Sequence, residues 1–202
     1  MTKIKICGLS RTEDIDTVNR LLPDFIGFVF APSRRKVDMK MAALLKKNLD
    51  SQIEAVGVFV NENIDTITKL HQDRIIDIVQ LHGDEDDEYM MRLKANGDCR
   101  IIKAVGIADT LPTLPTVPDY LLFDTRSVQR GGEGKTFDWN ILKDYTGLPY
   151  FLAGGLSAKN VTIAIQLLDP YCVDVSSGVE TSGFKDTDKM ARFIELVRPT
   201  SQ

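Results

Sequence analysis

The stretch PYFLAGGLSAKNVTIAIQLLDPYCVDVS, residues 149–176, contains a complete strand–helix–strand unit and decides the fold. It begins and ends with short apolar runs that are typical of buried parallel strands. Between them, AKNVTIAIQLL (158–168) carries apolar residues at three- and four-residue spacing, which predicts a helix. Ser157 stands where the N-cap of that helix is expected. Such a unit is the building block of parallel α/β folds.

Apolar runs of the same kind recur along the whole chain. Eight are found, at 4–7, 25–30, 55–60, 77–81, 100–105, 120–124, 149–154 and 172–176. Amphipathic segments that predict helices lie at 37–49, 63–73, 88–96, 158–168 and 186–197. Eight strands with alternating helices favour a single closed (β/α)8 TIM barrel over residues 1–202. The competing fold is a doubly wound open sheet with fewer strands.

Local sequence signals predict where helices begin and where an expected helix is absent. Ser10 with Glu13 predicts a capping box, and Asn61 occupies a predicted N-cap position. The segment DTLPTLPTVPD (109–119) contains three prolines. Because proline breaks helices, we expect a loop or a single turn there in place of the fifth helix.

The composition excludes several classes of protein. The chain has 202 residues, a net charge of -4 and no basic stripe, which argues against a nucleic-acid partner. No apolar run approaches the length of a membrane span, and the N-terminus lacks a signal-peptide core. The three cysteines, Cys7, Cys99 and Cys172, are far apart and form no CxxC pair. We therefore expect a cytoplasmic protein without a zinc site or a membrane attachment.

In a TIM barrel the active site lies at the carboxyl ends of the strands, and this position selects the candidate site residues. The candidates at these ends are Cys7, Gln80, His82, Asp124, Gly154, Gly155, Asp174, Ser176, Ser177 and Gly178. For Cys7, the residue type alone also permits a buried, inert thiol. For Asp124, it also permits a carboxylate that caps a turn. These alternatives stay open at this point.

Two glycine-containing turns follow the last two predicted strands. They lie in LAGGLSAKN (152–160) and DVSSGVE (174–180). Glycines let the backbone approach a ligand closely, and backbone N–H groups bind anions. Either turn alone could be a simple strand-to-helix connection. Their joint occurrence after strands seven and eight predicts a phosphate site.

Three further segments are rich in charge or glycine. RGGEGKT (130–136) matches neither the Walker motif nor the dinucleotide fingerprint. It predicts either a lid over 127–136, with Lys135 within reach of an anion, or a plain surface loop. The charges of the cluster SRRK (33–36) are either exposed to solvent at the rim of the barrel, or one of its arginines binds a carboxylate through two hydrogen bonds. HGDEDDE (82–88) lacks calcium-loop spacing, so no metal site is expected.

Nine segments are specific in combination. They are KICG (5–8), GFVFAPSRRKV (27–37), VGVFVN (56–61), VQLHGDE (79–85), IKAV (102–105), LLFDT (121–125), GGEGKTFDW (131–139), LAGGL (152–156) and VDVSSGVE (173–180). In this order they closely resemble the phosphoribosylanthranilate isomerase family of tryptophan biosynthesis. The resemblance implies an Amadori rearrangement of N-(5-phosphoribosyl)anthranilate to 1-(2-carboxyphenylamino)-1-deoxyribulose 5-phosphate. It implies general acid/base catalysis on a small phosphosugar, with no cofactor and no metal.

The resemblance also implies roles for individual residues. Cys7 falls on the general base and Asp124 on the general acid. Arg35 aligns with the arginine that binds the anthranilate carboxylate, with Arg34 beside it as the alternative. The substrate-binding residues are then expected to be Arg35, Gln80, His82, Gly154, Gly155, Asp174, Ser177 and Gly178.

Two neighbours of Cys7 carry further expectations. Gly8 should leave room for the sugar beside the thiol. A free thiol titrates near about 8.5, so Cys7 needs help to ionise at neutral pH. Lys5 is a candidate cation, since alternate residues of a regular strand point to the same side.

Other functions remain open from the sequence. A second phosphosugar enzyme, such as an aldolase that forms a Schiff base through Lys103, is one alternative. A non-catalytic phosphosugar-binding barrel is another. The pattern is compatible with a monomer or a homodimer.

Overall fold

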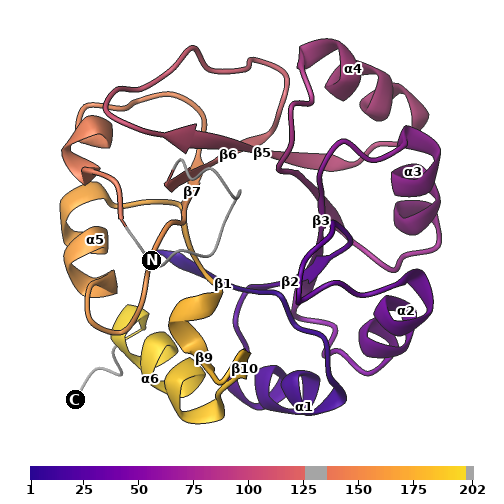
Figure 1. Ribbon diagram of the computed structural model, residues 1–202, viewed down its shortest axis with the longest axis horizontal. Helices are drawn as coiled ribbons and strands as arrows, with labels where there is room; N and C mark the ends of the chain where they lie inside the picture. Colours follow the sequence, from indigo (N-terminus) through magenta and orange to yellow (C-terminus); the bar gives the residue numbers. More distant parts are fainter. Residues whose placement is uncertain (126–135, 199–202) are drawn as a thin grey trace.

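The computed structural model describes residues 1–125 and 136–198, and its strands form a closed parallel barrel (Figure 1). The strands are β1 (Lys3–Cys7), β2 (Phe25–Val29), β3 (Glu54–Phe59), β4 (Ile78–Leu81), β5 (Arg100–Ile107), β6 (Tyr120–Thr125), β7 (Tyr150–Leu152) and β8 (Cys172–Val175). Closure is made by β1, in which Ile6 pairs with Ile26 on one side and with Val175 on the other. The predicted (β/α)8 barrel is confirmed, and the open sheet is wrong.

Helices surround the barrel (Figure 1). They are α1 (Thr12–Leu21), α2 (Met39–Lys47), α3 (Ile64–Gln72), α4 (Asp87–Asn96), α5 (Val161–Leu168) and α6 (Thr187–Val197). The proline-rich segment 109–119 contains no helix, as predicted. The described part of the connection after β6 contains only a 3-10 helix, η1 (Trp139–Leu142). None of the helices in residues 1–125 and 136–198 has the length and apolar character needed to cross a membrane.

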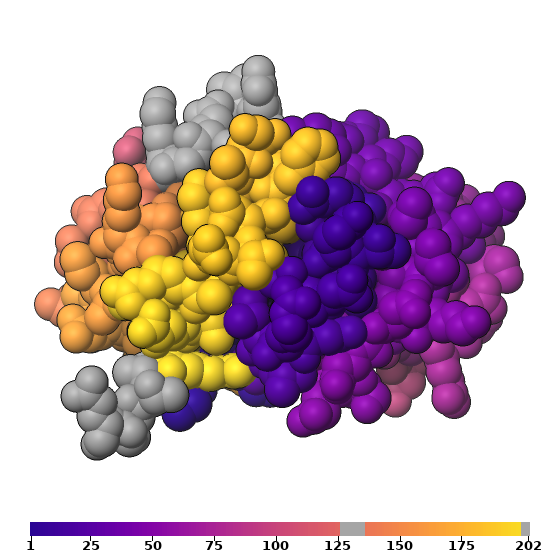
Figure 2. Space-filling model, turned by 90° about the horizontal axis from the view of Figure 1, so that it is seen from below, coloured from indigo at the N-terminus to yellow at the C-terminus, as the bar shows by residue number. Residues whose placement is uncertain are grey.

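The N-terminal and C-terminal regions of the described chain lie side by side on the surface of the barrel. Figure 2 shows the N-terminal region in indigo beside the C-terminal region in yellow. Helix α6 packs against α1 and α5, and Arg198 donates a hydrogen bond to the carbonyl of Leu22 at 2.8 Å. The last helix therefore covers the seam where β8 closes onto β1.

The predicted start of α1 is wrong by one residue. The N-cap is Arg11, not Ser10, and the carboxylate that accepts its backbone N–H is that of Asp14, not Glu13. The Asp14 carboxylate is buried and accepts hydrogen bonds from the backbone N–H groups of both Ser10 and Arg11. Because this buried carboxylate satisfies more donors than the exposed Glu13 could, the helix begins at Thr12.

Two other predicted N-caps are also displaced. Asn63, not Asn61, caps α3, while Asn61 adopts a left-handed conformation with φ 52°. Helix α5 has Asn160 at its N-cap position, and the hydroxyl of Ser157 accepts a hydrogen bond within the turn that precedes it. In both cases a short turn separates the strand end from the helix.

The hydrophobic core has two layers, separated by the wall of the barrel. The larger layer lies between the strands and the helices. The inner layer fills the base of the barrel with Phe25, Val56, Ile78, Ile102, Leu122, Phe151, Ala153 and Cys172. Side chains alternate across each strand, so residues two positions beyond these also point into the barrel. That alternation places the site.

Candidate active site

The predicted strand-end residues lie on one face of the barrel wall, above its apolar base. Gln80, Asp124 and Asp174 each stand two residues beyond an inner-layer residue of the same strand. On β1, Lys5 pairs in register with Asp174 and is fully buried, and Cys7 follows two residues later. The inside of the barrel is therefore apolar at its base and polar at its carboxyl end, where an active site is expected.

Cys7 is partly exposed and packs closely against β2. A Cβ atom added to Gly27 would lie 2.7 Å from the Cys7 sulfur, so glycine at that position makes room for the thiol. The main-chain carbonyl of Cys7 accepts a hydrogen bond from the hydroxyl of Ser176 at 2.9 Å. Contacts to β2 and to the residue that follows β8 thus hold Cys7 at the mouth of the barrel.

Lys5 lies inside the barrel with Cys7, as the strand alternation requires. Its Nζ donates to Oδ2 of Asp174 at 2.8 Å, and its side chain has no exposed surface. Burial alone would lower the pKa of Lys5, but the Asp174 carboxylate and Cys7 outweigh it and raise that pKa. Lys5 is therefore a protonated ammonium group beside the thiol.

A second buried lysine near Cys7 was missed by sequence reasoning. Lys185 belongs to a short hairpin, β9 (Glu180–Thr181) and β10 (Phe184–Lys185), that no pattern predicted. Its Nζ donates to the carbonyl of Ser176 at 2.9 Å and to Oε1 of Glu180 at 2.8 Å. Burial lowers the pKa of Lys185, while Glu180 and Cys7 act in the opposite direction.

Neighbouring groups shift the pKa of the Cys7 thiol in opposite directions. Burial is the largest and raises its pKa, and the Asp174 carboxylate acts in the same direction. Lys5 and Lys185 both lower it, but the net shift is upward. The thiol form of Cys7 is therefore favoured, and two lysine side chains are placed to stabilise its thiolate.

Asp124 ends a chain of polar contacts that joins the ends of β4 and β6. The Gln80 Nε2 and His82 Nδ1 atoms are 3.1 Å apart, and His82 Nε2 lies 3.5 Å from Asp124 Oδ2. If the amide donates to Nδ1, the histidine proton is on Nε2 and faces the carboxylate. The other carboxylate oxygen accepts the N–H of Thr125 at 2.7 Å. Asp124 is thus oriented from two sides.

The two glycine turns lie against each other. Gly154 and Gly155 have φ values of 82° and 69°, a conformation that other residues rarely adopt. A Cβ atom on Gly178 would lie 1.9 Å from the carbonyl oxygen of Leu156, so only glycine permits the second turn, which contains Ser177, to approach the first. The structure brings together the two turns that the sequence singled out separately.

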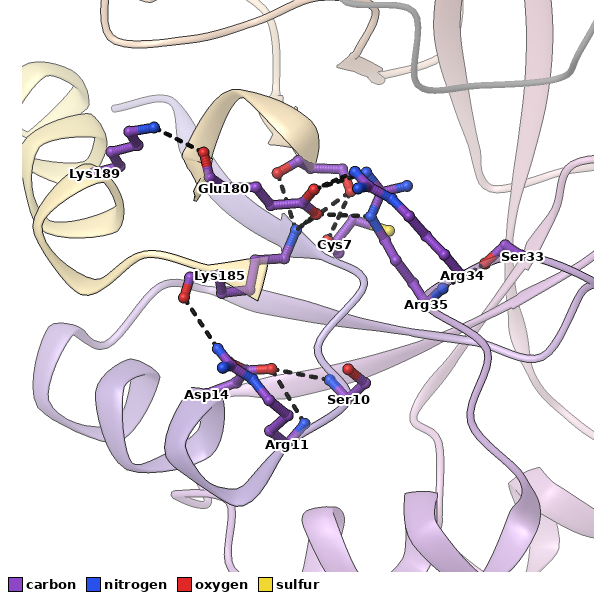
Figure 3. Close-up of polar contacts among 11 residues, drawn as sticks. Cys7, Ser10, Arg11, Asp14, Ser33, Arg34, Arg35, Glu180, Lys185 and Lys189 are labelled. Carbon is purple, nitrogen blue, oxygen red and sulfur yellow. Dashed lines mark hydrogen bonds and ion pairs between the residues drawn. The ribbon is translucent and has the colours of Figure 1, made fainter. Parts of the chain in front are cut away.

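Arg35 reaches the site from the loop after β2. Its side chain passes over Gly8, where an added Cβ atom would lie 2.4 Å from Arg35 Cδ. A side chain at position 8 would therefore collide with Arg35, and the expected room for a sugar beside the thiol stays a prediction. Both Arg34 and Arg35 pair with Glu180 (Figure 3), but Arg35 is 16% exposed and Arg34 55% exposed. Arg35 is the arginine nearer the interior.

Lys103 is held away from the barrel interior. Ile102 belongs to the inner layer, so Lys103 lies on the opposite face of β5. Its Nζ donates at 2.8 Å both to Oε2 of Glu85 and to the carbonyl of Gly83. A buried, ion-paired ammonium group outside the site is unsuited to attack a carbonyl carbon, which argues against the Schiff-base alternative.

One prediction falls largely outside the described residues. The predicted lid at 127–136, with Lys135, lies outside the described residues apart from Thr136. Within residues 1–125 and 136–198, no three His, Cys, Asp or Glu side chains are grouped so as to hold a metal ion.

Comparison with known proteins gives a consistent result. A family model described as N-(5'phosphoribosyl)anthranilate (PRA) isomerase matches residues 4–196. The chain is 49% identical over 199 residues to an N-(5'-phosphoribosyl)anthranilate isomerase from Endomicrobium trichonymphae, covering 98% of this chain and 99% of that protein. A counterpart from Lachnoclostridium phytofermentans is 47% identical, with 95% of each chain covered.

Solved structures are similar over the same length. The phosphoribosyl anthranilate isomerase from Thermotoga maritima has a TM-score of 0.87 and 34% identity, covering 99% of this chain and 100% of that one. A further isomerase structure has a TM-score of 0.82 and 31% identity, with coverage of 99% and 100%. That protein is in complex with reduced 1-(o-carboxyphenylamino)-1-deoxyribulose 5-phosphate.

Proposed function

The chain belongs to the N-(5'-phosphoribosyl)anthranilate isomerase family, and we propose that Cys7 and Asp124 perform the proton transfers of the family's reaction in it. It is an isomerase of tryptophan biosynthesis that converts N-(5-phosphoribosyl)anthranilate to 1-(2-carboxyphenylamino)-1-deoxyribulose 5-phosphate by an Amadori rearrangement. The observation that carries this conclusion is the family match over residues 4–196, nearly the whole chain.

The proposed mechanism needs one acid and one base. Asp124 gives a proton to the furanose ring oxygen, and the lone pair of the anthranilate nitrogen opens the ring to an iminium ion. The Cys7 thiolate then removes the C2′ proton, and the electron pair of that bond neutralises the iminium nitrogen. The resulting enolamine tautomerises to the ketone. His82 supports Asp124 from 3.5 Å, and Lys5 and Lys185 favour the thiolate.

The remaining predicted residues bind the substrate in this proposal. The adjoining turns at Gly154, Gly155, Ser177 and Gly178 hold its phosphate with backbone N–H groups. Within the described residues, Asp174 Oδ1 and Gln80 Oε1 are buried oxygens with no hydrogen-bond partner. Buried polar atoms are normally paired, so we assign them to accept hydrogen bonds from ribose hydroxyls.

The function is tested with the purified protein. N-(5-phosphoribosyl)anthranilate should disappear with a change in fluorescence, and the gene should rescue a tryptophan auxotroph that lacks this step. Tight binding of the reduced product analogue without turnover would instead identify a non-catalytic barrel. Reductive trapping of a covalent adduct on Lys103 with borohydride would support the aldolase.

The first prediction concerns pH. Because burial raises the pKa of Cys7, the thiolate fraction at neutral pH is small and grows as pH rises. We therefore expect kcat/KM to increase from about pH 7 toward the pKa of the thiol. Lys185→Met removes a cation that lowers this pKa and should move the rising limb to higher pH.

The measurement is the rate of Cys7 alkylation by iodoacetamide across pH, alongside the pH profile of kcat/KM. Lys189→Met is the control, since Lys189 is exposed and its ammonium group donates to the main-chain carbonyl of Glu180. If the rise of kcat/KM with pH occurs at the same pH in Lys185→Met as in wild type, Lys185 does not stabilise the thiolate.

The second prediction distinguishes the two arginines. Arg35→Ala should raise KM by about tenfold or more, because a bidentate charged contact with the anthranilate carboxylate is lost. Arg34→Ala should change KM much less, since its side chain is 55% exposed. Steady-state kinetics on both variants decide the matter. The reverse order of effects would transfer the carboxylate site to Arg34.

Three broader proposals accompany this function. We propose that residues 1–202 form one catalytic domain and that the protein is a monomer or a homodimer. A related isomerase from Thermotoga maritima, 31% identical, is described as dimeric. Light scattering on the purified protein measures the mass directly. The three free cysteines agree with a cytoplasmic location.

A further inference from the structure

Glu180 is the common partner of three cations at the mouth of the barrel. Arg35 donates to it through Nε at 2.7 Å and Nη2 at 3.0 Å. Lys185 donates at 2.8 Å, and Arg34 pairs with the same carboxylate. The Glu180 side chain is only 5% exposed. Burial would raise its pKa, but Arg35 and Lys185 outweigh this and lower it, so Glu180 is ionised.

The pair between Arg35 and Glu180 uses one particular edge of the guanidinium. Nε and Nη2 form the side edge, and both carboxylate oxygens meet it. A guanidinium has a second, end edge made of Nη1 and the other N–H of Nη2. That edge is also suited to bidentate binding of a carboxylate. Glu180 therefore occupies one edge of Arg35 and leaves the other for a second carboxylate.

The charges around Glu180 also favour a second anion. Three cations, Arg34, Arg35 and Lys185, face this one carboxylate (Figure 3). Because one negative charge does not balance three positive ones, an incoming carboxylate need not displace Glu180. Removing the buried Glu180 from its partners would instead leave charges unpaired, which is costly.

Glu180 is itself fixed in place by the hairpin. It pairs in register with Lys185 across β9 and β10, and the carbonyl of Lys185 accepts a hydrogen bond from Arg11 at 3.0 Å. At the other end of the contact, the stem of Arg35 lies over Gly8. The guanidinium is thus held from both sides before substrate arrives, which lowers the entropic cost of binding.

We propose that Glu180 is a positioning residue that orients the end edge of Arg35 toward the 2-carboxylate of the substrate's aromatic ring. Glu180 does not touch the substrate; it acts through Arg35. It makes the enzyme selective for an aryl amine that bears an ortho carboxylate. This inference rests on the proposed function of Arg35 in the isomerase.

The test compares two ligands on wild type and on Glu180→Gln. One ligand is the reduced product analogue, and the other is the same compound without its carboxyl group. Glutamine keeps the shape of Glu180 but loses its charge and one of its two acceptors. The preference of wild type for the carboxylated ligand should fall by about tenfold in Glu180→Gln. The affinity for the ligand without the carboxyl group should remain within about twofold, since a merely structural defect would weaken both ligands.

Lys189→Met is the matched control, because the Lys189 ammonium group donates to the main-chain carbonyl of Glu180; it should keep the wild-type preference. An unchanged preference in Glu180→Gln would overturn the proposal. Tighter binding of the carboxylated ligand would also overturn it, since Glu180 would then be a competitor for Arg35. Should Glu180→Gln fail to fold, Arg35→Lys keeps the charge without the two edges, and a full preference in that variant would overturn the proposal equally.

Failure of the underlying function has a different signature. If wild type neither turns over the substrate nor prefers the carboxylated ligand, the assignment of Arg35 fails before any variant is measured. If wild type passes both tests and Glu180→Gln retains the full preference, only the positioning role of Glu180 fails.

Discussion

Asp124→Asn should lower kcat by about 10²–10⁴-fold, the usual contribution of a general acid. Asparagine has the shape of aspartate, and its carbonyl oxygen can still accept the N–H of Thr125 that Asp124 accepts at 2.7 Å. It has no proton to give to the ring oxygen. Because the side chain is partly exposed and no core packing is lost, the protein should fold normally.

The measurement is single-turnover and steady-state kinetics with a thermal melt on the same sample. Asp119→Asn is the matched control, since Asp119 precedes the same strand at its opposite end and pairs with Lys94. It should retain turnover near that of wild type, whatever it costs in stability. An Asp124→Asn variant that kept more than about a tenth of wild-type kcat would assign the acid to another group.

The barrel could be predicted from the sequence because its strands are buried on both faces. Such strands appear as unbroken apolar runs, and all eight predicted runs correspond to strands of the structure. The starts of α1 and α3 were missed because several adjacent side chains could accept hydrogen bonds from the free backbone N–H groups of the first turn, and the sequence does not show which one does. In α1, Asp14 accepts these hydrogen bonds because it is buried and is held by the Arg11 side chain, and neither feature is visible in the sequence.

Part of the site could be predicted for the same geometric reason. Strand alternation alone places Cys7, Asp124 and Asp174 at one end of the barrel. Strand alternation also shows on which face of β5 Lys103 lies, a residue that the sequence left as a candidate nucleophile. Once Ile102 is known to face the interior, Lys103 has to face away from it.

Glu180 and Lys185 could not be predicted. Arg35 and Glu180 are separated by 145 residues along the chain. Their contact exists only because closure of β8 onto β1 brings the hairpin to the loop after β2. The hairpin strands are two residues each, too short to produce a periodic pattern. Long-range charge contacts between irregular segments are therefore the part of the site that needed the structure.

Cys7→Ala should also reduce kcat by about 10²–10⁴-fold, since the base that removes the C2′ proton is lost. The change deletes one sulfur atom at a partly exposed position, so the fold should survive. Ring opening by Asp124 does not require the thiol, and binding of the reduced product analogue should be nearly unchanged. Loss of kcat with retained affinity is the pattern of a residue that acts in the transition state.

Cys99→Ala is the matched control. Cys99 is buried ahead of β5 and away from the barrel mouth, so its loss should cost stability but not turnover. Cys7→Ser separates ionisation from shape, because a hydroxyl keeps the geometry but is far less acidic than a thiol. If the thiolate is the base, Cys7→Ser should be nearly as inactive as Cys7→Ala, in spite of Lys5 and Lys185 nearby. A serine variant with substantial activity would show that those two ammonium groups, and not the acidity of sulfur, supply most of what proton removal at C2′ requires.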